Sequence, residues 1–288
     1  MNFVRIVMTV FAAALVFSAG AASAQQQAPK RSISKISGDV YQFKNNFHNS
    51  VFMVTPEGII FVDPINAGAS GWLKEELKKR FNQPVRYVVY SHDHADHISG
   101  GEVFADTATF VAHENAKRDI GDEKRPTPVP DISFTDELTL ELGGKRVVLS
   151  YVGRNHSDNM IVVGFPDERI LHAVDFIPVH SVAFRDLPDA YVDEWIESLA
   201  RVEQMDFDVL SPGHSAFGKK EDVAAYRGYM QDLRSAVVAA ARAGQTLEQA
   251  QESIKLEKYK DWNGYQRSLK LNIAGMYTHV QLTRRGNP

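Results

Sequence analysis

A run of histidines and aspartates, Ser91-His92-Asp93-His94-Ala95-Asp96-His97, follows a short apolar segment at residues 85–90. Residues two apart in an extended chain point the same way, so His92 and His94 can present their imidazoles to one point. Asp96 and His97 follow at a predicted turn or helix start. Imidazole and carboxylate are ligands that a borderline cation such as Zn²⁺ accepts. The chain contains no cysteine, so the run predicts a metal site without thiolate ligands.

Three later residues stand where such a site would need them. His156 lies in a polar loop, Asn155-His156-Ser157-Asp158-Asn159, between two predicted strands. Asp175 ends the predicted strand at residues 169–174, and His214 follows a short apolar pair in Ser211-Pro212-Gly213-His214. Functional sites in α/β proteins gather where strands end. We therefore predict that all three join the same site.

The elements that must position these residues alternate between strands and helices. The β-rich runs are residues 40–43, 51–55, 59–62, 85–90, 138–142, 146–151, 160–164 and 169–173. Helical spacing of apolar residues covers 72–81, 192–202, 223–237 and 269–282. The proline-containing stretch 118–130 is predicted to be a surface loop, and His113 and His279 are predicted to lie in helices. Two strand sets with interspersed helices predict an α/β fold with two packed sheets covered by helices.

Composition and the first residues bound the class of protein. The 288 residues are 44% hydrophobic and 24% charged, as in an ordinary globular protein. A net charge of −4 argues against a nucleic-acid partner. Arg5, the apolar run 6–17 and Ala22-Ser23-Ala24 predict a signal peptide at residues 1–24. We expect cleavage after Ala24 and export, to the periplasm rather than the medium, with no membrane attachment afterwards. Residues 25–288 are predicted to form a single domain, of which 219–288 is a helical C-terminal extension.

Five motifs together resemble the metallo-β-lactamase superfamily of hydrolases. They are the His-x-His-x-Asp-His run and residues 57–63, 156–159, 172–175 and 212–214. The resemblance covers about residues 36–218. It implies a four-layer αββα sandwich, which agrees with the pattern of predicted elements.

The resemblance also implies a ligand set for two metal ions. His92, His94 and His156 would hold the first metal, Asp96, His97 and His214 the second, and Asp175 would bridge them. Asp96 would also be a candidate proton acceptor. Asp63, at the end of its strand, resembles the aspartate that steadies the histidine-rich loop from behind.

These residues predict an enzyme with two Zn²⁺ ions, although iron and manganese are chemically open. A metal-bound hydroxide would attack the carbonyl of an ester, thioester or cyclic amide, including a β-lactam or lactone. The familiar β-lactamases have Cys at the position of Asp175 and lack a ligand at His97. The complete His/Asp set is typical of the thioesterase, lactonase and phosphodiesterase branches. The expected partner is a small-molecule substrate, and the sequence leaves the oligomeric state open.

Two other functions fit the same residues. One is a mononuclear iron persulfide dioxygenase that would bind iron through His92, His156 and Asp175. The other is a non-catalytic periplasmic metal-binding protein. His48, His180 and Phe184 are the residues expected to line a substrate pocket.

Overall fold

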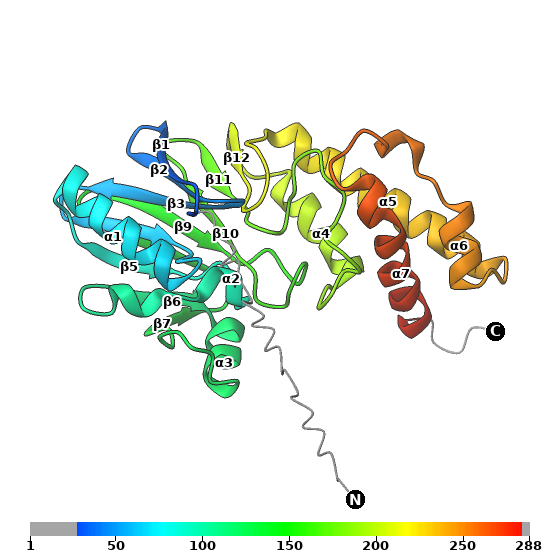
Figure 1. The fold of residues 1–288 in the computed structure, drawn as a ribbon, viewed down its shortest axis with the longest axis horizontal. Helices are drawn as coiled ribbons and strands as arrows, with labels where there is room; N and C mark the ends of the chain where they lie inside the picture. The colour runs from blue at the N-terminus through cyan, green and yellow to red at the C-terminus, as the bar shows by residue number, and fades with distance from the viewer. Residues whose placement is uncertain (1–27, 284–288) are drawn as a thin grey trace, which may run out of the picture.

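Two β-sheets packed face to face form the centre of the computed structural model, which describes residues 28–283 (Figure 1). The predicted signal peptide, residues 1–24, lies outside the described residues. Helices cover the outer face of each sheet, so the fold has four layers in the order αββα. This is the predicted fold class.

The first sheet has seven strands in chain order, β1 to β7. Strands β1 to β4 are antiparallel, and β4 to β7 are parallel to one another. The turn Pro56-Glu57 joins β3 to β4. The strands are β1 Arg31–Ser37, β2 Val40–Asn45, β3 His48–Thr55, β4 Gly58–Val62, β5 Val85–Val89, β6 Thr109–His113 and β7 Ile132–Phe134.

The second sheet has five strands in the order β12-β11-β10-β9-β8. Only the β11–β12 pair is parallel; the other pairs are antiparallel. The strands are β8 Glu137–Leu142, β9 Lys145–Ser150, β10 Val162–Phe165, β11 Ile170–His172 and β12 Val209–Ser211.

Side-chain alternation along the strands separates the apolar layers. In β4, Ile60 and Val62 pack between the sheets, against residues of the second sheet such as Val163. Ile59 and Phe61 point to the other face, where they pack with Leu73 and Leu77 of α1. This two-residue period requires each strand to be covered on both faces.

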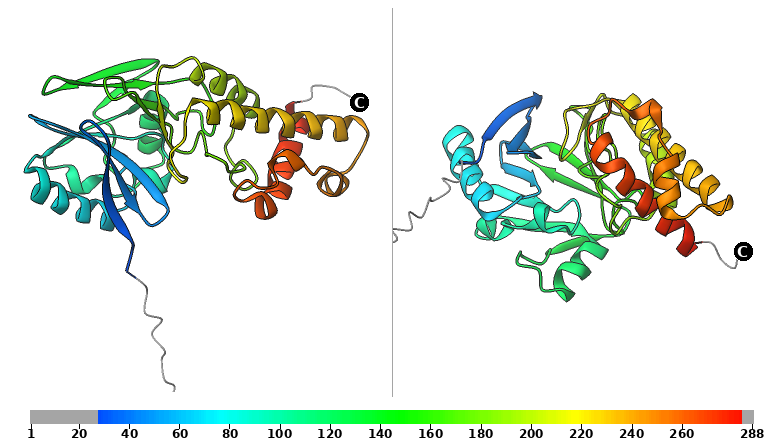
Figure 2. Two further views of the ribbon diagram at one scale, coloured as in Figure 1. Left: turned by 90° about the horizontal axis from the view of Figure 1, so that it is seen from above. Right: turned by 45° about the vertical axis from the view of Figure 1, so that its right-hand side comes forward.

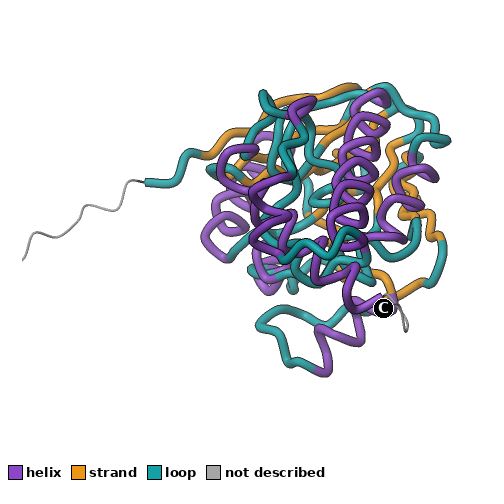
Figure 3. Tube along the Cα trace, turned by 90° about the vertical axis from the view of Figure 1, so that its right-hand side faces the viewer, coloured by secondary structure: helices purple, strands orange, loops and turns teal. Residues whose placement is uncertain are grey.

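The helices form two groups. One group covers the first sheet and the other covers the second sheet, with α5 and α7 packed against each other (Figures 2 and 3). The first group is α1 Ala67–Phe81, α2 Ala95–Ile98, η1 Gly101–Phe104 and α3 Glu114–Asp122. The second group is α4 Val192–Val202, α5 Lys220–Arg242, α6 Leu247–Ser253, η2 Glu257–Tyr259 and α7 Tyr265–Thr283. Within residues 28–283, no helix is both long and apolar enough to cross a membrane.

Two local predictions were wrong. The stretch 118–130 is not all loop, because α3 continues to Asp122 with Ala116 and Ile120 buried one turn apart. The prolines at 126, 128 and 130 lie beyond the end of this short helix and therefore do not interrupt it. His113 is not a helix residue: it ends β6, and its ring accepts a hydrogen bond from the Asn115 amide at the start of α3.

Candidate metal centre

The histidine-rich run occupies the loop between β5 and α2. His92 is fully buried, and its Nδ1 lies 2.9 Å from the Ser91 hydroxyl. His94 precedes α2 in an extended conformation, and His97 lies in the single turn of that helix. The short helix therefore follows directly on the extended residues, as the spacing of the run predicts. It brings Asp96 and His97 beside the two earlier imidazoles.

Asp63 holds this loop from beneath. It follows β4, is fully buried, and adopts a left-handed backbone conformation with φ of 54°. Its carboxylate accepts hydrogen bonds from the Ser91 amide at 2.8 Å and the Ser91 hydroxyl at 2.6 Å. The same carboxylate lies 3.1 Å from His97 Nδ1, so it directs His97 Nε2 outward. Asp63 thus occupies the supporting position expected from the sequence.

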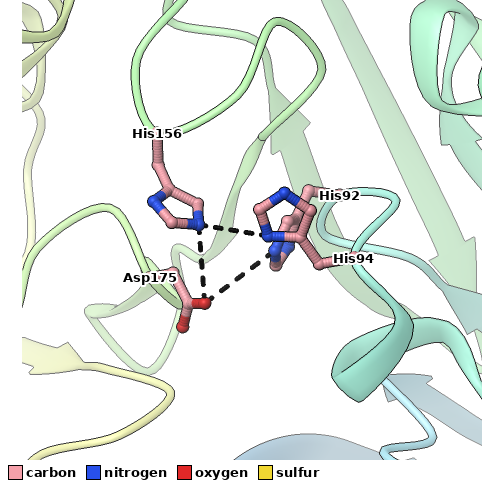
Figure 4. Close-up of side chains that lie close together, drawn as sticks. All are labelled: His92, His94, His156 and Asp175. Atoms are coloured by element: carbon pink, nitrogen blue, oxygen red, sulfur yellow. Dashed lines mark hydrogen bonds and ion pairs between the residues drawn. The ribbon is translucent and has the colours of Figure 1, made fainter. Parts of the chain in front are cut away.

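Four side chains form the first donor group (Figure 4). His92, His94, His156 and Asp175 each offer one atom, and these atoms all lie within 4.8 Å of one another. His94 Nδ1 is 3.2 Å from His156 Nε2. Asp175 Oδ2 lies 3.9 Å from His92 Nε2 and 3.7 Å from His156 Nε2. Three separate loops therefore direct their side chains to one point.

A second donor group shares Asp175. His97 Nε2 lies 3.3 Å from Asp175 Oδ2, and His214 Nε2 lies 3.0 Å from Asp175 Oδ1. Asp96 Oδ2 is 3.6 Å from His97 Nε2 and 3.2 Å from His48 Nε2. The two oxygens of one carboxylate therefore lie between two sets of imidazoles, the position that a bridging ligand requires.

Burial favours the neutral form of two histidines in the first group, His92 and His156. It places the pKa of His92 well below its usual range, assisted by the neighbouring His97 and His94. Burial also lowers the pKa of His156 to about 4. Neutral imidazole is the form that binds a metal ion. These two rings are therefore ready to act as ligands at neutral pH without first losing a proton.

The carboxylates remain charged beside these rings. Burial alone would raise the pKa of Asp175, but His97 and His214 hold it well below its usual range. In Asp96, the hydrogen bond from His48 and the nearby His97 outweigh burial and lower the pKa to about 2. Both groups thus offer anionic oxygens to a cation.

The donor set fits a pair of divalent ions. A tetrahedral Zn²⁺ with bonds of about 2.0–2.1 Å places neighbouring donors about 3.3–3.4 Å apart, close to the spacings observed here. His92 Nε2 is buried and has no hydrogen-bond partner among residues 28–283, and Asp175 Oδ1 accepts no well-aligned hydrogen bond there. Buried polar atoms of this kind normally have partners, and a metal ion would supply them.

Sequence reasoning missed a polar network behind the same loop. The amide nitrogen of Asn159 lies 3.0 Å from Asp93 Oδ1, and Asn159 Oδ1 accepts a hydrogen bond from the Asp93 backbone. Arg125 pairs with the Asp93 carboxylate at 2.9 Å and donates to its carbonyl. Asp93 lies within the histidine run, and its pairing ties that run to the loop of His156. The signal available in the sequence was the position of Asp93 between two candidate ligands.

A cavity of about 590 Å³ opens beside the donors. Phe184 lines it, as expected, and so does Phe47. His180 does not line it: its ring is mostly exposed and lies 3.1 Å from Asp222 instead. His48 contacts Asp96 at the edge of the donor groups but is not part of the lining. Several other lining residues were not predicted to be pocket residues: Tyr226, Trp195, Asn263, Gly264, Arg267 and Ser268.

Comparisons with known proteins agree with this geometry. The family model described as "Metallo-beta-lactamase superfamily" matches residues 44–214. A relative from Nocardioides sp. (strain JS1661), the 2,4-dinitroanisole O-demethylase subunit alpha, is 26% identical over 65% of this chain; the alignment spans 58% of that relative. The metallo-beta-lactamase type 2 of Bacillus cereus is 29% identical over 60% of this chain and 68% of its own length.

A solved structure shows the same fold. The metallo-beta-lactamase from Pontibacter korlensis superposes with a TM-score of 0.63 at 22% identity, covering 70% of this chain and 99% of that one. The family match spans more than half of the chain, from β2 to the end of the loop after β12. This chain therefore belongs to the metallo-β-lactamase superfamily of metal-dependent hydrolases.

Proposed function

We propose that this protein is a dinuclear zinc hydrolase that cleaves an ester, thioester or cyclic amide, a class that includes lactones and β-lactams. One observation carries the proposal. The carboxylate of Asp175 lies between two donor groups, with His92 and His156 on one side and His97 and His214 on the other. A mononuclear centre at the first donor group would leave the imidazoles of His97 and His214 without a metal ion to bind.

The proposed assignment of ligands follows from these contacts. His92, His94 and His156 would hold one ion, Asp96, His97 and His214 the other, and Asp175 would bridge them. Two divalent ions, when bound, activate water at neutral pH and polarise the substrate carbonyl. The protein's own contribution is to keep His92 and His156 neutral through burial, and to turn His97 Nε2 toward the site through the contact of Asp63 with His97 Nδ1.

Asp96 has a second proposed role as proton acceptor. Its side chain is half exposed and lines the cavity, and Asp96 Oδ2 lies 3.2 Å from His48 Nε2. His48 therefore fixes the orientation of the Asp96 carboxylate.

The first test is metal content by elemental analysis, on protein expressed in medium that contains both zinc and iron. About two zinc ions per chain is the result expected from a shared Asp175. About one iron per chain would overturn the proposal in favour of an iron oxygenase using His92, His156 and Asp175.

We also propose that residues 1–24 are removed on export to the periplasm. N-terminal sequencing of protein from periplasmic extract tests that proposal.

The second test is a substrate panel of a β-lactam, a lactone, a thioester and an aryl ester. The panel includes 2,4-dinitroanisole, because the Nocardioides relative carries that compound in its name. Turnover that is lost on chelation and restored by zinc supports the hydrolase. Two bound zinc ions without turnover of any member would favour a non-catalytic metal-binding protein.

A further inference from the structure

The wall of the cavity opposite the strand ends comes from the C-terminal helices. Tyr226 of α5 lines it, as do Asn263, Gly264, Arg267 and Ser268 around the start of α7. All of these residues lie beyond position 214, where the match to the family model ends. Figure 2 shows α5 and α7 side by side at the end of the molecule that carries the C-terminus. This wall is therefore a feature of this chain that the family match does not describe.

Tyr226 lines the cavity and has an unsatisfied hydroxyl. Its side chain is fully buried, and its hydroxyl has no hydrogen-bond partner among residues 28–283. Burial raises the pKa of Tyr226 well above its usual range, so the hydroxyl keeps its proton. By contrast, the hydroxyl of Tyr229, three residues further along α5, donates to Asn272 Oδ1. Buried hydroxyls are normally hydrogen-bonded, so a ligand in the cavity is the natural partner of Tyr226.

Arg267 presents a cation to the same cavity. Its guanidinium makes no hydrogen bond or ion pair with any side chain in the part of the chain that the structure describes. Arg227 and Arg234, on the neighbouring helix α5, instead pair with Glu203 and Asp193. Arg267 Nη2 lies 3.9 Å from the position that a Cβ would take on Gly264, another lining residue. Arg267 is therefore an exposed residue of the cavity lining with its guanidinium donors free.

Between these polar groups the lining is apolar. Val182, Ala183, Phe184 and Leu187 come from the loop after β11, and Trp195 comes from α4. A ligand that fills this space needs an apolar body. It needs a hydrogen-bond acceptor near Tyr226, beside the donor groups, and a negative charge at the end that reaches Arg267.

Helix α7 also holds the apolar side of the cavity in place. The Asn272 amide is fully buried and donates to the carbonyls of Ala183, at 2.9 Å, and Arg185. At Gly275 the helix approaches the loop so closely that a Cβ would lie 1.9 Å from the Asp186 carbonyl oxygen. The loop itself contains a non-glycine residue at positive φ, Leu187 (56°), inside the lining. A fixed, strained loop of this kind is typical of a binding site.

We propose that the C-terminal helices select substrates that carry a carboxylate remote from the cleaved bond, with Arg267 binding that carboxylate and Tyr226 donating a hydrogen bond to the substrate beside the metal centre. This inference deepens the proposed hydrolase function and rests on it. It names the substrate class as an ester, thioester or amide of an organic acid that retains a free carboxylate.

The test compares matched pairs of esters. Each pair is the mono-4-nitrophenyl ester of a dicarboxylic acid and the methyl ester of the same compound, in succinate, adipate and suberate lengths. We expect the protein to prefer the acid in at least one length by kcat/KM. Arg267→Ala is expected to reduce that preference, measured as the ratio of kcat/KM for the acid to kcat/KM for the neutral ester, about 5-fold, within the range for an exposed charge pair. Arg267→Lys is expected to keep part of the preference.

The matched control is Arg242→Ala, which removes the same charge from an exposed position at the end of α5 outside the cavity lining. It is expected to leave both esters unaffected. Equal preference for the acid in wild type and Arg267→Ala would overturn the role of Arg267. Equal loss in Arg267→Ala and Arg242→Ala would show a general effect of charge and would overturn it as well.

Tyr226→Phe tests the other residue with two readouts. The variant removes a hydroxyl that has no partner, so the melting temperature is expected to stay the same or rise, while kcat/KM falls about 10-fold for both esters. A lower melting temperature with unchanged kcat/KM would assign Tyr226 a structural role and overturn this part of the proposal.

Failure of the proposed hydrolase function is distinguishable from failure of this inference. If no ester is turned over, binding is followed through tryptophan fluorescence, to which Trp195 in the cavity lining contributes. Tighter binding of adipate monomethyl ester than of adipate dimethyl ester, lost in Arg267→Ala, would support the inference without any reaction. Equal binding of the two compounds would overturn it.

Discussion

The metal centre and the C-terminal wall face the same cavity but are built in opposite ways. In the centre, side chains from five loops hold one another: His97 contacts both Asp63 and Asp175, and His214 contacts Asp175 in turn. In the wall, the Tyr226 hydroxyl and the Arg267 guanidinium make no hydrogen bond or ion pair with another side chain in the part of the chain that the structure describes. The centre's polar groups are arranged around a cation, whereas those of the wall are left for a substrate.

This difference separates reaction from specificity. Changes in the centre should alter metal binding, stability and every reaction together, because its residues share partners. Changes in the wall should alter turnover or the choice between substrates without loss of metal, because neither Tyr226 nor Arg267 is a proposed metal ligand. In folds that support many different reactions, the residues that carry out the reaction are commonly separate from those that select the substrate. Four predictions test the division, beginning with the largest expected effect.

Asp175→Ala should abolish the centre. Both oxygens of Asp175 are placed between the donor groups, so its loss removes a ligand from each proposed ion. We expect activity to fall about 1,000-fold or more, equivalent to about 4 kcal/mol of transition-state stabilisation. We also expect fewer than two bound metal ions per chain. Elemental analysis and the substrate panel measure both. The control is Asp167→Ala, at the far turn between β10 and β11. Two bound metal ions in Asp175→Ala would contradict the bridging role.

Chelation should lower the melting temperature of the wild-type protein. A ligand present at 1,000 times its Kd stabilises the folded state by about 4 kcal/mol, which for a chain of this size corresponds to a shift on the order of 5–10 °C. Differential scanning calorimetry with and without chelator measures the shift. In the Asp175→Ala variant the chelator should have little effect. An unchanged melting temperature for the wild type would argue against a buried centre with two ions.

Asp63→Asn should weaken the centre without removing a ligand. The substitution keeps the size of the side chain but removes the charge that accepts hydrogen bonds from Ser91 and faces His97. Loss of such a supporting contact typically costs about 10- to 100-fold in metal affinity or activity. Competition with a metal indicator measures the affinity. Asp39→Asn, an exposed carboxylate paired with Lys145, is the control and should behave as wild type.

The two regions also differ in how much of them the sequence could predict. His92, His94, Asp96 and His97 are neighbours in the chain, so local geometry alone predicts that they meet. The positions of His156, Asp175 and His214 after strands made their convergence predictable, and the structure brings them together. The alternation of strands and helices was sufficient for the four-layer fold. It was not sufficient for α3, where prolines beyond the helix masked two buried residues in it.

The wall gave no comparable signal. Tyr226 falls in a helical stripe with Val223, Met230 and Leu233, where a tyrosine is indistinguishable from a core residue. Arg267 has no spacing relation to any metal ligand, and it reaches the cavity only because α7 packs beside α5. Contacts of this kind depend on how distant helices pack, and hydrophobic periodicity reports only that a helix has a buried face.

The smallest effect is expected from Tyr229→Phe, and it sharpens the comparison most directly, because Tyr226 and Tyr229 are three residues apart on the same helix. The Tyr229 hydroxyl donates to Asn272 Oδ1, and Asn272 in turn holds the carbonyls of Ala183 and Arg185. Its loss leaves a buried acceptor unsatisfied, at a cost of about 1–3 kcal/mol. Tyr229→Phe should therefore lower the melting temperature by a few degrees, whereas Tyr226→Phe should not. Urea unfolding of both variants checks the difference, since equal destabilisation would mean that the Tyr226 hydroxyl already has a partner within the fold.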